Sequence, residues 1–216
     1  MSPVWKQRFN AFKQNKRAKI SAVIFILVFT ISLFSELIAN DKPLLLKYKG
    51  QFYFPIATTY TDEFFGGDFP TPADYQDKYI ADNIKNNGWM LMPPIPFSYN
   101  TVDYEINTPV PSAPDKHHLL GTDDEGRDIA ARILYGIRLS VLFAFLLTAF
   151  SSIIGIVIGA VQGYFGGKVD LILQRFIEIW ESLPQLFILI IVASVFLPTF
   201  WTILLILMLF SWTSLT

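Results

Sequence analysis

Residues 121–141, GTDDEGRDIAARILYGIRLSV, decide the fold, because a block of charge passes directly into a long apolar run. From Ile129 onward the apolar residues recur at spacings of three and four, which predicts one face of a helix. Thr122 or Asp123 is expected to cap that helix, with the neighbouring acids near its positive end. The stretch is therefore predicted to be an amphipathic helix that lies at the extracytoplasmic surface of the membrane and continues into a membrane span.

Three arginines, Arg127, Arg132 and Arg138, lie off the apolar face of this helix or at its edge. Long basic side chains at such positions reach lipid headgroups or pair with nearby acids. A calcium loop is the alternative explanation for the acids. Their spacing departs from that of an EF-hand, so the interfacial helix is preferred.

The composition is that of a membrane protein. Of 216 residues, 52% are hydrophobic and only 16% are charged, and the mean hydropathy is +0.41. Ordinary globular domains carry about 25% charged residues. The apolar residues gather in a few long runs, which predicts membrane-spanning helices.

The charges are distributed unevenly along the chain. Residues 1–19 hold six bases and no acid, whereas residues 41–131 hold 14 acids and seven bases. Basic residues accumulate on the cytoplasmic side of membrane proteins, so the N-terminus is predicted to be cytoplasmic. Residues 20–38 form the first predicted span. A signal peptide is the alternative, but the apolar core is long for one and no suitable cleavage site follows.

Residues 39–120 are polar, acidic and rich in proline, glycine and aromatic residues. They are predicted to form a small, loop-rich extracytoplasmic segment. The chain has no cysteine, so this segment must fold by packing and without disulfides. His117 and His118 are the only histidines. An adjacent pair cannot complete a zinc site alone, and no metal is expected.

Residues 121–216 contain three further apolar runs, at 139–161, 176–197 and 200–216. The last run extends to the end of the sequence and is expected to be an incomplete helix. The predicted fold class is an all-α polytopic membrane protein, with the loop-rich extracytoplasmic segment inserted between the first two helices.

Small residues recur every four positions along the second predicted span. They are Ser151, Gly155, Gly159 and Gly163. This spacing places them on one helical face, where small side chains let helix backbones approach closely. Packing within the chain and packing against a partner subunit are both consistent with the pattern.

Glu178 and Glu181 are three residues apart and share a face of the third predicted span. Carboxylates within a membrane span are candidates for function, but both lie in its first two turns, where water is within reach. The interpretation that both are water-exposed charges at the cytoplasmic end of the span is preferred. Pro184 is expected to break or kink the helix. The chain has no phosphate-binding loop and no nucleophile or metalloprotease motif, so it is not expected to be an enzyme.

The opening stretch resembles the segment that begins the membrane domain of C-type permeases in peptide-importing ABC transporters. The matching residues are Gly121, Thr122, Asp123, Gly126, Arg127, Asp128, Arg132, Gly136, Arg138 and Ser140. Ala131 departs from the usual serine but remains small. A second family motif is matched by Gly163, Tyr164, Gly166, Gly167, Asp170, Ser182 and Pro184. The two motifs together are highly specific.

The outer segment also resembles the permeases of bacterial microcin C and peptide importers, in FSELIANDKPLL, DFPTPADYQD and NNGWMLMPPIPF. The resemblance implies a multi-pass inner-membrane subunit with the six-helix, type I importer domain and no cofactor. Its implied partners are a homologous B-type permease, two ATP-hydrolysing subunits, a periplasmic peptide-binding protein and the lipid bilayer, with no nucleic acid. The family's E-A-A-x-x-x-G coupling loop and last two spans are not within the 216 residues, so the chain is expected to be an N-terminal portion.

Two other classes of protein are weighed against this interpretation. A membrane-anchored extracytoplasmic sensing or interaction protein would suit the first span and the acidic segment. It would not need the glycine ladder or the Gly-Gly turn after residue 139. A secondary transporter would usually show internal repeats, and none is found in the sequence.

Overall fold

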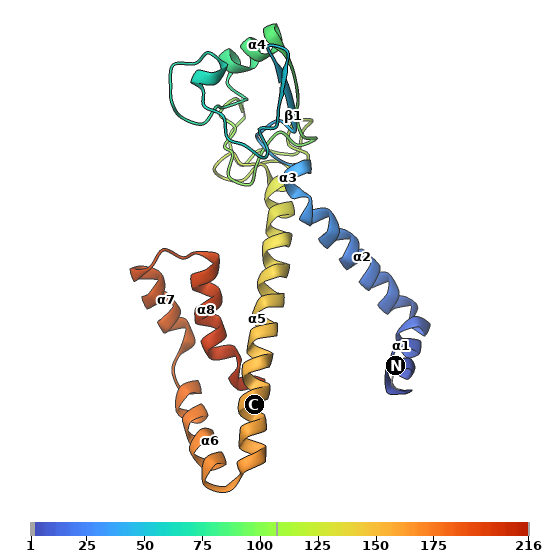
Figure 1. The fold of residues 1–216 in the computed structure, drawn as a ribbon, viewed down its shortest axis with the longest axis vertical. Helices are drawn as coiled ribbons and strands as arrows, with labels where there is room; N and C mark the ends of the chain where they lie inside the picture. The colour runs from blue at the N-terminus through green and yellow to red at the C-terminus, as the bar shows by residue number, and fades with distance from the viewer. Residues whose placement is uncertain (1–2, 107, 216) are drawn as a thin grey trace. The chain divides into compact units, whose positions relative to one another are not determined.

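A computed structural model describes residues 3–106 and 108–215 of the chain (Figure 1). The chain is mostly helical and divides into two compact units, residues 1–138 and 139–216. The long helix α5, Ile129–Phe165, begins in the first unit and continues into the second.

The N-terminal helices are α1, Pro3–Gln14, α2, Lys16–Leu33, and the short α3, Ser35–Ile38. The side chain of Asn15 caps α2 by accepting a hydrogen bond from the N–H of Ala18 at 3.1 Å. Within the predicted span 20–38 the helix is interrupted at Phe34, between α2 and α3.

The segment between α3 and α5, residues 39–128, is called the outer segment below. It contains a three-stranded antiparallel sheet in the order β2-β1-β3. The strands are β1, Leu45–Tyr48, β2, Gln51–Tyr53, and β3, Gly88–Leu91. Lys49 and Gly50 connect β1 to β2, and both have positive φ angles, of 49° and 83°. Two-residue hairpin turns need this conformation, because it matches the twist of the strands.

One face of the sheet packs against helix α4, Lys78–Asn87, and the 3₁₀ turn η1, Glu63–Phe65. Asp77 caps α4 by accepting from the N–H groups of Tyr79 and Ile80, at 2.8 and 3.2 Å. The buried core is formed by Leu46, Tyr48, Phe65, Tyr75, Ile80 and Ile84. The outer segment thus has its own apolar core, one helix and a small sheet, with loops making up most of the rest.

Helix α5 begins at Ile129, and the expected caps Thr122 and Asp123 are wrong. The cap is Asp128, whose Oδ1 accepts a hydrogen bond from the N–H of Ala131 at 2.7 Å. The earlier polar residues are held in a loop that bends at Gly126, where φ is 81°. The helix has 37 residues and extends beyond both ends of the predicted span 139–161.

The second unit continues with α6, Gly167–Glu181, α7, Gln185–Val195, α8, Phe200–Ser211, and the 3₁₀ turn η2, Thr213–Leu215 (Figure 1). The break expected at Pro184 is present, and α6 and α7 are bent by 65° across it. Helical structure starts at Gly167, nine residues before the predicted span 176–197.

Among the described residues, α5 alone is long and apolar enough to cross a membrane as a single helix. The bent pair α6 and α7 passes the same criterion when taken together, and α8 is a shorter apolar helix.

Candidate functional site

A buried histidine connects the outer segment to the start of α5. His118 Nδ1 lies 2.9 Å from Oδ2 of Asp128, and its Nε2 lies 3.1 Å from Oδ2 of Asp103. His118 and Asp128 are only 2% and 1% exposed, and the imidazole stacks on Phe97. The two ring nitrogens of His118 therefore contact carboxylates from two parts of the chain, Asp103 in the outer segment and Asp128 just before α5.

A tight turn delivers His118 to this position. Asp115 Oδ1 accepts from the backbone N–H groups of His117 and His118, at 2.8 and 2.6 Å. The N–H of Asp115 donates back to the carbonyl of His118 at 2.9 Å. These backbone donors favour the ionised carboxylate and lower the pKa of Asp115, with the N–H of His118 the largest cause. His117 points outward and is exposed.

The charged loop that opens the sequence motif is closed by its own ion pairs. Arg127 Nε donates to Oδ2 of Asp123 at 2.8 Å, and its Nη1 lies 2.8 Å from Glu125. Arg132, one turn into α5, donates to the same oxygen of Asp123. Asp123 also accepts from the backbone N–H of Arg127 at 2.9 Å. The carboxylate therefore fastens the loop to the first turns of the helix, and does not cap it.

Thr122 anchors the loop from the other side. Its hydroxyl accepts from the N–H of Ser112 at 3.0 Å and lies 3.0 Å from the Ser112 hydroxyl. Gly121 has a φ of 77°, and a Cβ there would lie 2.3 Å from the Ser112 carbonyl. Both facts require glycine at this position. We call residues 112–132 with Asp103 the collar.

The first helical turns of α5 are also fastened to the end of α3. Tyr135 donates to the carbonyl of Ala39 at 3.0 Å, and Arg138 pairs with Glu36 at 3.3 Å. Ala39 and Ala131 are fully buried in a small apolar cluster with two residues of the outer segment, Ile95 and Phe97. The end of α3 and the start of α5 are thus held together where they adjoin the outer segment.

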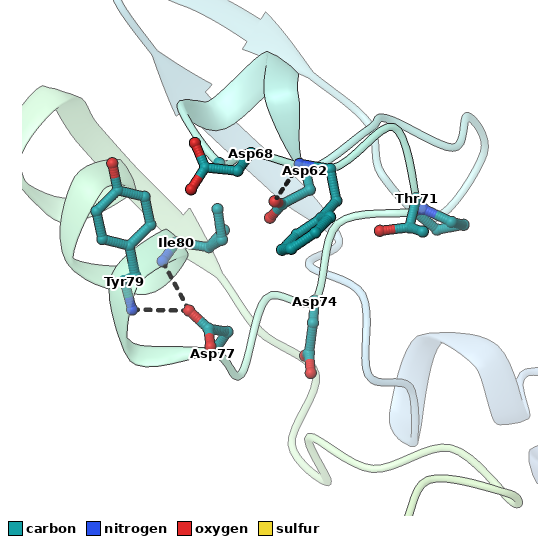
Figure 2. Close-up of a pocket in the computed structure, with 10 residues that line it drawn as sticks. Asp62, Asp68, Thr71, Asp74, Asp77, Tyr79 and Ile80 are labelled. Atoms are coloured by element: carbon teal, nitrogen blue, oxygen red, sulfur yellow. Dashed lines mark hydrogen bonds between the residues drawn. The ribbon is translucent and has the colours of Figure 1, made fainter.

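Two cavities of the outer segment border the start of α4. One, of about 320 Å³, is lined by four aspartates, Asp62, Asp68, Asp74 and Asp77 (Figure 2). Three of these already accept hydrogen bonds. Asp77 caps α4, Asp62 accepts from the N–H of Phe69 at 3.3 Å, and Asp74 accepts from the N–H of Gln76 at 2.9 Å. Within residues 3–106 and 108–215 no three His, Cys, Asp or Glu residues are placed to hold a metal ion.

The second cavity, of about 770 Å³, borders the collar. Its walls include Asp103, His117 and the exposed Tyr104. Lys78 and Glu105 form a 3.0 Å ion pair on its rim, and this contact raises the pKa of Lys78. Both cavities are open surfaces of mixed polarity, with no arrangement of a nucleophile and a base.

The ladder of small residues divides along α5. Ser151 and Gly155 are buried, and a Cβ on Gly155 would lie 2.7 Å from Cβ of Leu215 and 2.9 Å from the Trp212 carbonyl. Gly163 is exposed, with open space where a Cβ would stand. Gly159 is half-buried between them. Close packing within the described part of the chain therefore accounts for Ser151 and Gly155, the first two residues of the ladder.

The second motif lies at the other end of α5. Gly166 and Gly167 both have positive φ, 55° and 52°, and reverse the chain into α6, where Asp170 lies in the first turn. Glu178 pairs with Arg175 at 2.5 Å, and Ser182 ends α6 by donating to the Ile179 carbonyl. Gly136, in the first motif, has open space around it. The structure therefore gathers residues 121–132 of the first motif into the collar, places Gly136, Arg138 and Ser140 further along α5, and leaves the second motif as a turn and a bent helix.

Sequence reasoning missed His118 and Asp103. The contact joins three residues 10 to 25 positions apart, and it depends on how two loops fold back on α5. The role of Asp128 as the helix cap can be predicted from the sequence, because it is a residue type that caps helices and it directly precedes the apolar pattern that starts at Ile129.

The N-terminal part of the chain matches a known family model. Residues 4–55 match the N-terminal TM domain of oligopeptide transport permease C.

Similarity to curated proteins extends over the whole chain. It is 49% identical over 215 residues to an inner membrane ABC transporter permease protein, YejE, of Escherichia coli, covering 100% of the chain and 63% of that protein. It is 44% identical over 235 residues to a peptidoglycan transport system permease protein, YejE, of Agrobacterium fabrum, covering 98% and 61%. A dipeptide transport system permease protein, DppC, of Haemophilus influenzae is 44% identical over 82 residues, 38% of the chain and 28% of that protein. The chain thus spans about three fifths of the length of the YejE proteins.

Proposed function

The chain is related to the YejE, OppC and DppC permeases of ABC and peptide transport systems, and we propose that it serves as a permease subunit of an ATP-driven importer that moves peptides across the bacterial inner membrane. The observation that carries this proposal is the 49% identity to an ABC permease along the entire chain. The apolar helices α5, α7 and α8 are in keeping with it, since a permease must line a path through lipid.

The proposed topology is polytopic, with the membrane domain of a type I importer beginning at the collar. The basic residues of α1 and of the first turn of α2 favour a cytoplasmic N-terminus. Residues 20–38 would cross outward, and α5 would return inward. The Gly166–Gly167 turn is then cytoplasmic, α6 and α7 together form one broken span, and α8 begins the next.

The proposed partners follow from the relatives. A permease of this kind works with a homologous B-type permease, two ATPase subunits and a periplasmic binding protein, all embedded in or docked on the bilayer. The chain carries no phosphate-binding loop, so ATP would be hydrolysed by the partner subunits. Alternating access would be driven by their ATP cycle.

The proposed cargo is a peptide. The relatives are named for dipeptide, oligopeptide and peptidoglycan transport, and peptides are the chemistry common to all three. Microcin C-like peptide-nucleotides are a further candidate, since they carry a peptide part.

The collar is proposed to hold the outer segment in a fixed position at the entrance of the membrane domain. His118 pairs with Asp128 and Arg127 pairs with Asp123, and all four side chains are mostly buried. Groups occupied in this way are suited to ordering a loop and not to binding cargo directly.

The test is peptide uptake by whole cells. A strain lacking the gene for this permease is supplied with a labelled peptide, with and without the complete gene restored. Restored uptake that is lost with an ATPase variant unable to hydrolyse ATP is the expected result. The alternative, a membrane-anchored sensing or interaction protein, predicts unchanged uptake in all of these strains, and that outcome would overturn the proposal.

A further inference from the structure

Helix α6 separates its polar and apolar side chains onto opposite sides. With each residue turning by about 100°, the polar side chains fall within an arc of about 160°. They are Lys168, Asp170, Gln174, Arg175, Glu178 and Glu181. The rest of the circumference carries Val169, Ile172, Leu173, Phe176, Ile177, Ile179 and Trp180. Leu171 is the one apolar residue inside the polar arc. A helix in lipid would not need such an arc.

The apolar side of α6 is the one that meets α8. Trp180 stacks on Phe210 with ring centroids 5.6 Å apart, and its Nε1 donates to the carbonyl of Leu209 at 2.9 Å. Phe176 stacks on Trp180 in turn, at 5.8 Å. Because the polar arc is centred about half a turn away from these rings, it points away from α8.

Contacts between α8 and α5 give the depth of Trp180. Phe200, at the start of α8, packs on Phe143 at 5.4 Å, and Trp212, just after α8 ends, approaches Gly155. The end of α8, and with it Trp180, is therefore level with Gly155. The apolar run of α5 continues for six more residues to Val161, a rise of about 9 Å. Glu181, next to Trp180, thus lies at the depth of the apolar run.

A carboxylate at such a depth faces a protein interior or water, because an ionised side chain in hydrocarbon is costly. The carboxylate of Glu178 is paired with Arg175. The carboxylate of Glu181 has no hydrogen bond or ion pair to any residue of the described ranges 3–106 and 108–215. A short glutamate side chain cannot reach back across about 9 Å, as a long basic side chain can.

We infer that the polar arc of α6 lines a water-filled path through the membrane part of the protein, with Gln174, Glu178 and Glu181 in contact with that water. The inference rests on the proposed transport function and deepens it, since it identifies the side of α6 that the cargo passes. Ile172 and Ile179, on the opposite side, face lipid or neighbouring helices.

Residues 1–216 contain no cysteine, so an introduced cysteine is the only one among them, and its labelling is compared with that of the complete transporter without the substitution. Glu181→Cys and Gln174→Cys are compared with Ile179→Cys and Ile172→Cys in the complete transporter, reconstituted in lipid vesicles. The probe is a negatively charged methanethiosulfonate that does not cross membranes, presented on both sides. The expected result is modification of the two polar-arc cysteines at least tenfold faster than that of the two controls, with a rate that changes when ATP and peptide are added.

Equal rates at Glu181→Cys and Ile179→Cys would overturn the inference. Protection of Glu181→Cys from a membrane-permeant maleimide as well would overturn it too, by showing that a partner subunit covers the arc. Peptide uptake by the same vesicles separates the two proposals. Uptake without fast labelling contradicts the water-filled path alone, whereas fast labelling without uptake of any tested peptide contradicts the proposed function and leaves the path standing.

Discussion

Asp128 serves His118 and helix α5 at the same time. Its Oδ2 lies 2.9 Å from Nδ1 of His118, while its Oδ1 accepts from the N–H of Ala131 at 2.7 Å. One buried carboxylate therefore contacts a side chain of the outer segment and also caps helix α5. A change at either residue is transmitted to the other, because a buried ionic group that loses its partner stays uncompensated.

Replacing His118 with alanine should lower the free energy of unfolding of the outer segment by about 1–3 kcal/mol, because it leaves Oδ2 of the buried Asp128 without its hydrogen-bond partner. Thermal unfolding of the purified chain, followed by tryptophan fluorescence, measures this. His117→Ala is the matched control. That side chain is exposed, so its effect should stay within about 0.5 kcal/mol. Equal effects of the two substitutions would show that the buried contact contributes nothing.

Arg127→Ala should reduce the yield and stability of the protein without altering which peptides are carried. The side chain bridges Asp123 and Glu125 and is only 22% exposed, so its loss loosens the collar. Competition between labelled peptides for uptake, normalised to the amount of protein in the membrane, gives the two effects separately. Lys85→Ala removes an exposed base whose nearest acid is 3.9 Å away, and should change neither. Normal yield with altered peptide selectivity would contradict a structural role for Arg127.

Gly155→Val and Gly163→Ala should act in opposite directions. A side chain at Gly155 meets Leu215 and the Trp212 carbonyl, so overpacking should cost about 1–3 kcal/mol. At Gly163 there is open space, and alanine should stabilise the helix by up to about 1 kcal/mol. Thermal unfolding in detergent gives both values. Destabilisation by Gly163→Ala would indicate that a partner subunit packs closely on that end of α5.

The turn before His118 should make stability depend on pH in the acid range. The pKa of Asp115 is lowered in the folded chain from its ordinary 3.8, so its contribution is present above that pH and is lost as the pH falls through the folded value. The difference in melting temperature between the wild type and Asp115→Ala should therefore be constant near neutrality and shrink below about pH 4. Asp115→Asn, which keeps an acceptor but does not titrate, is the comparison. A difference that grows on acidification would contradict this sign.

Prediction from the sequence works best where the cause is local. Proline at 184 and the glycine pair at 166 and 167 act on their own stretch of backbone, and the structure breaks or turns the chain at both places. Hydrophobic spacing also locates the start of the helix at Ile129.

Where loops fold back on a helix, local patterns are insufficient. The sequence pattern predicts Thr122 or Asp123 as the cap of α5, yet the loop bends at Gly126, and both residues make other contacts. The pairing of His118 with Asp103 and Asp128 depends on the packing of Phe97 and the turn at Asp115. No spacing along the sequence indicates those contacts.

The unbroken course of α5 has a consequence for how related chains can vary. A single residue inserted or deleted between Phe143 and Gly155 would rotate Gly155 by about 100° relative to Phe143 and remove it from the face that meets α8. Seven residues, close to two full turns, would restore that face to within about 20°. Length changes among related chains are therefore expected in the loops of the outer segment, while the count of residues between Phe143 and Gly155 should stay constant.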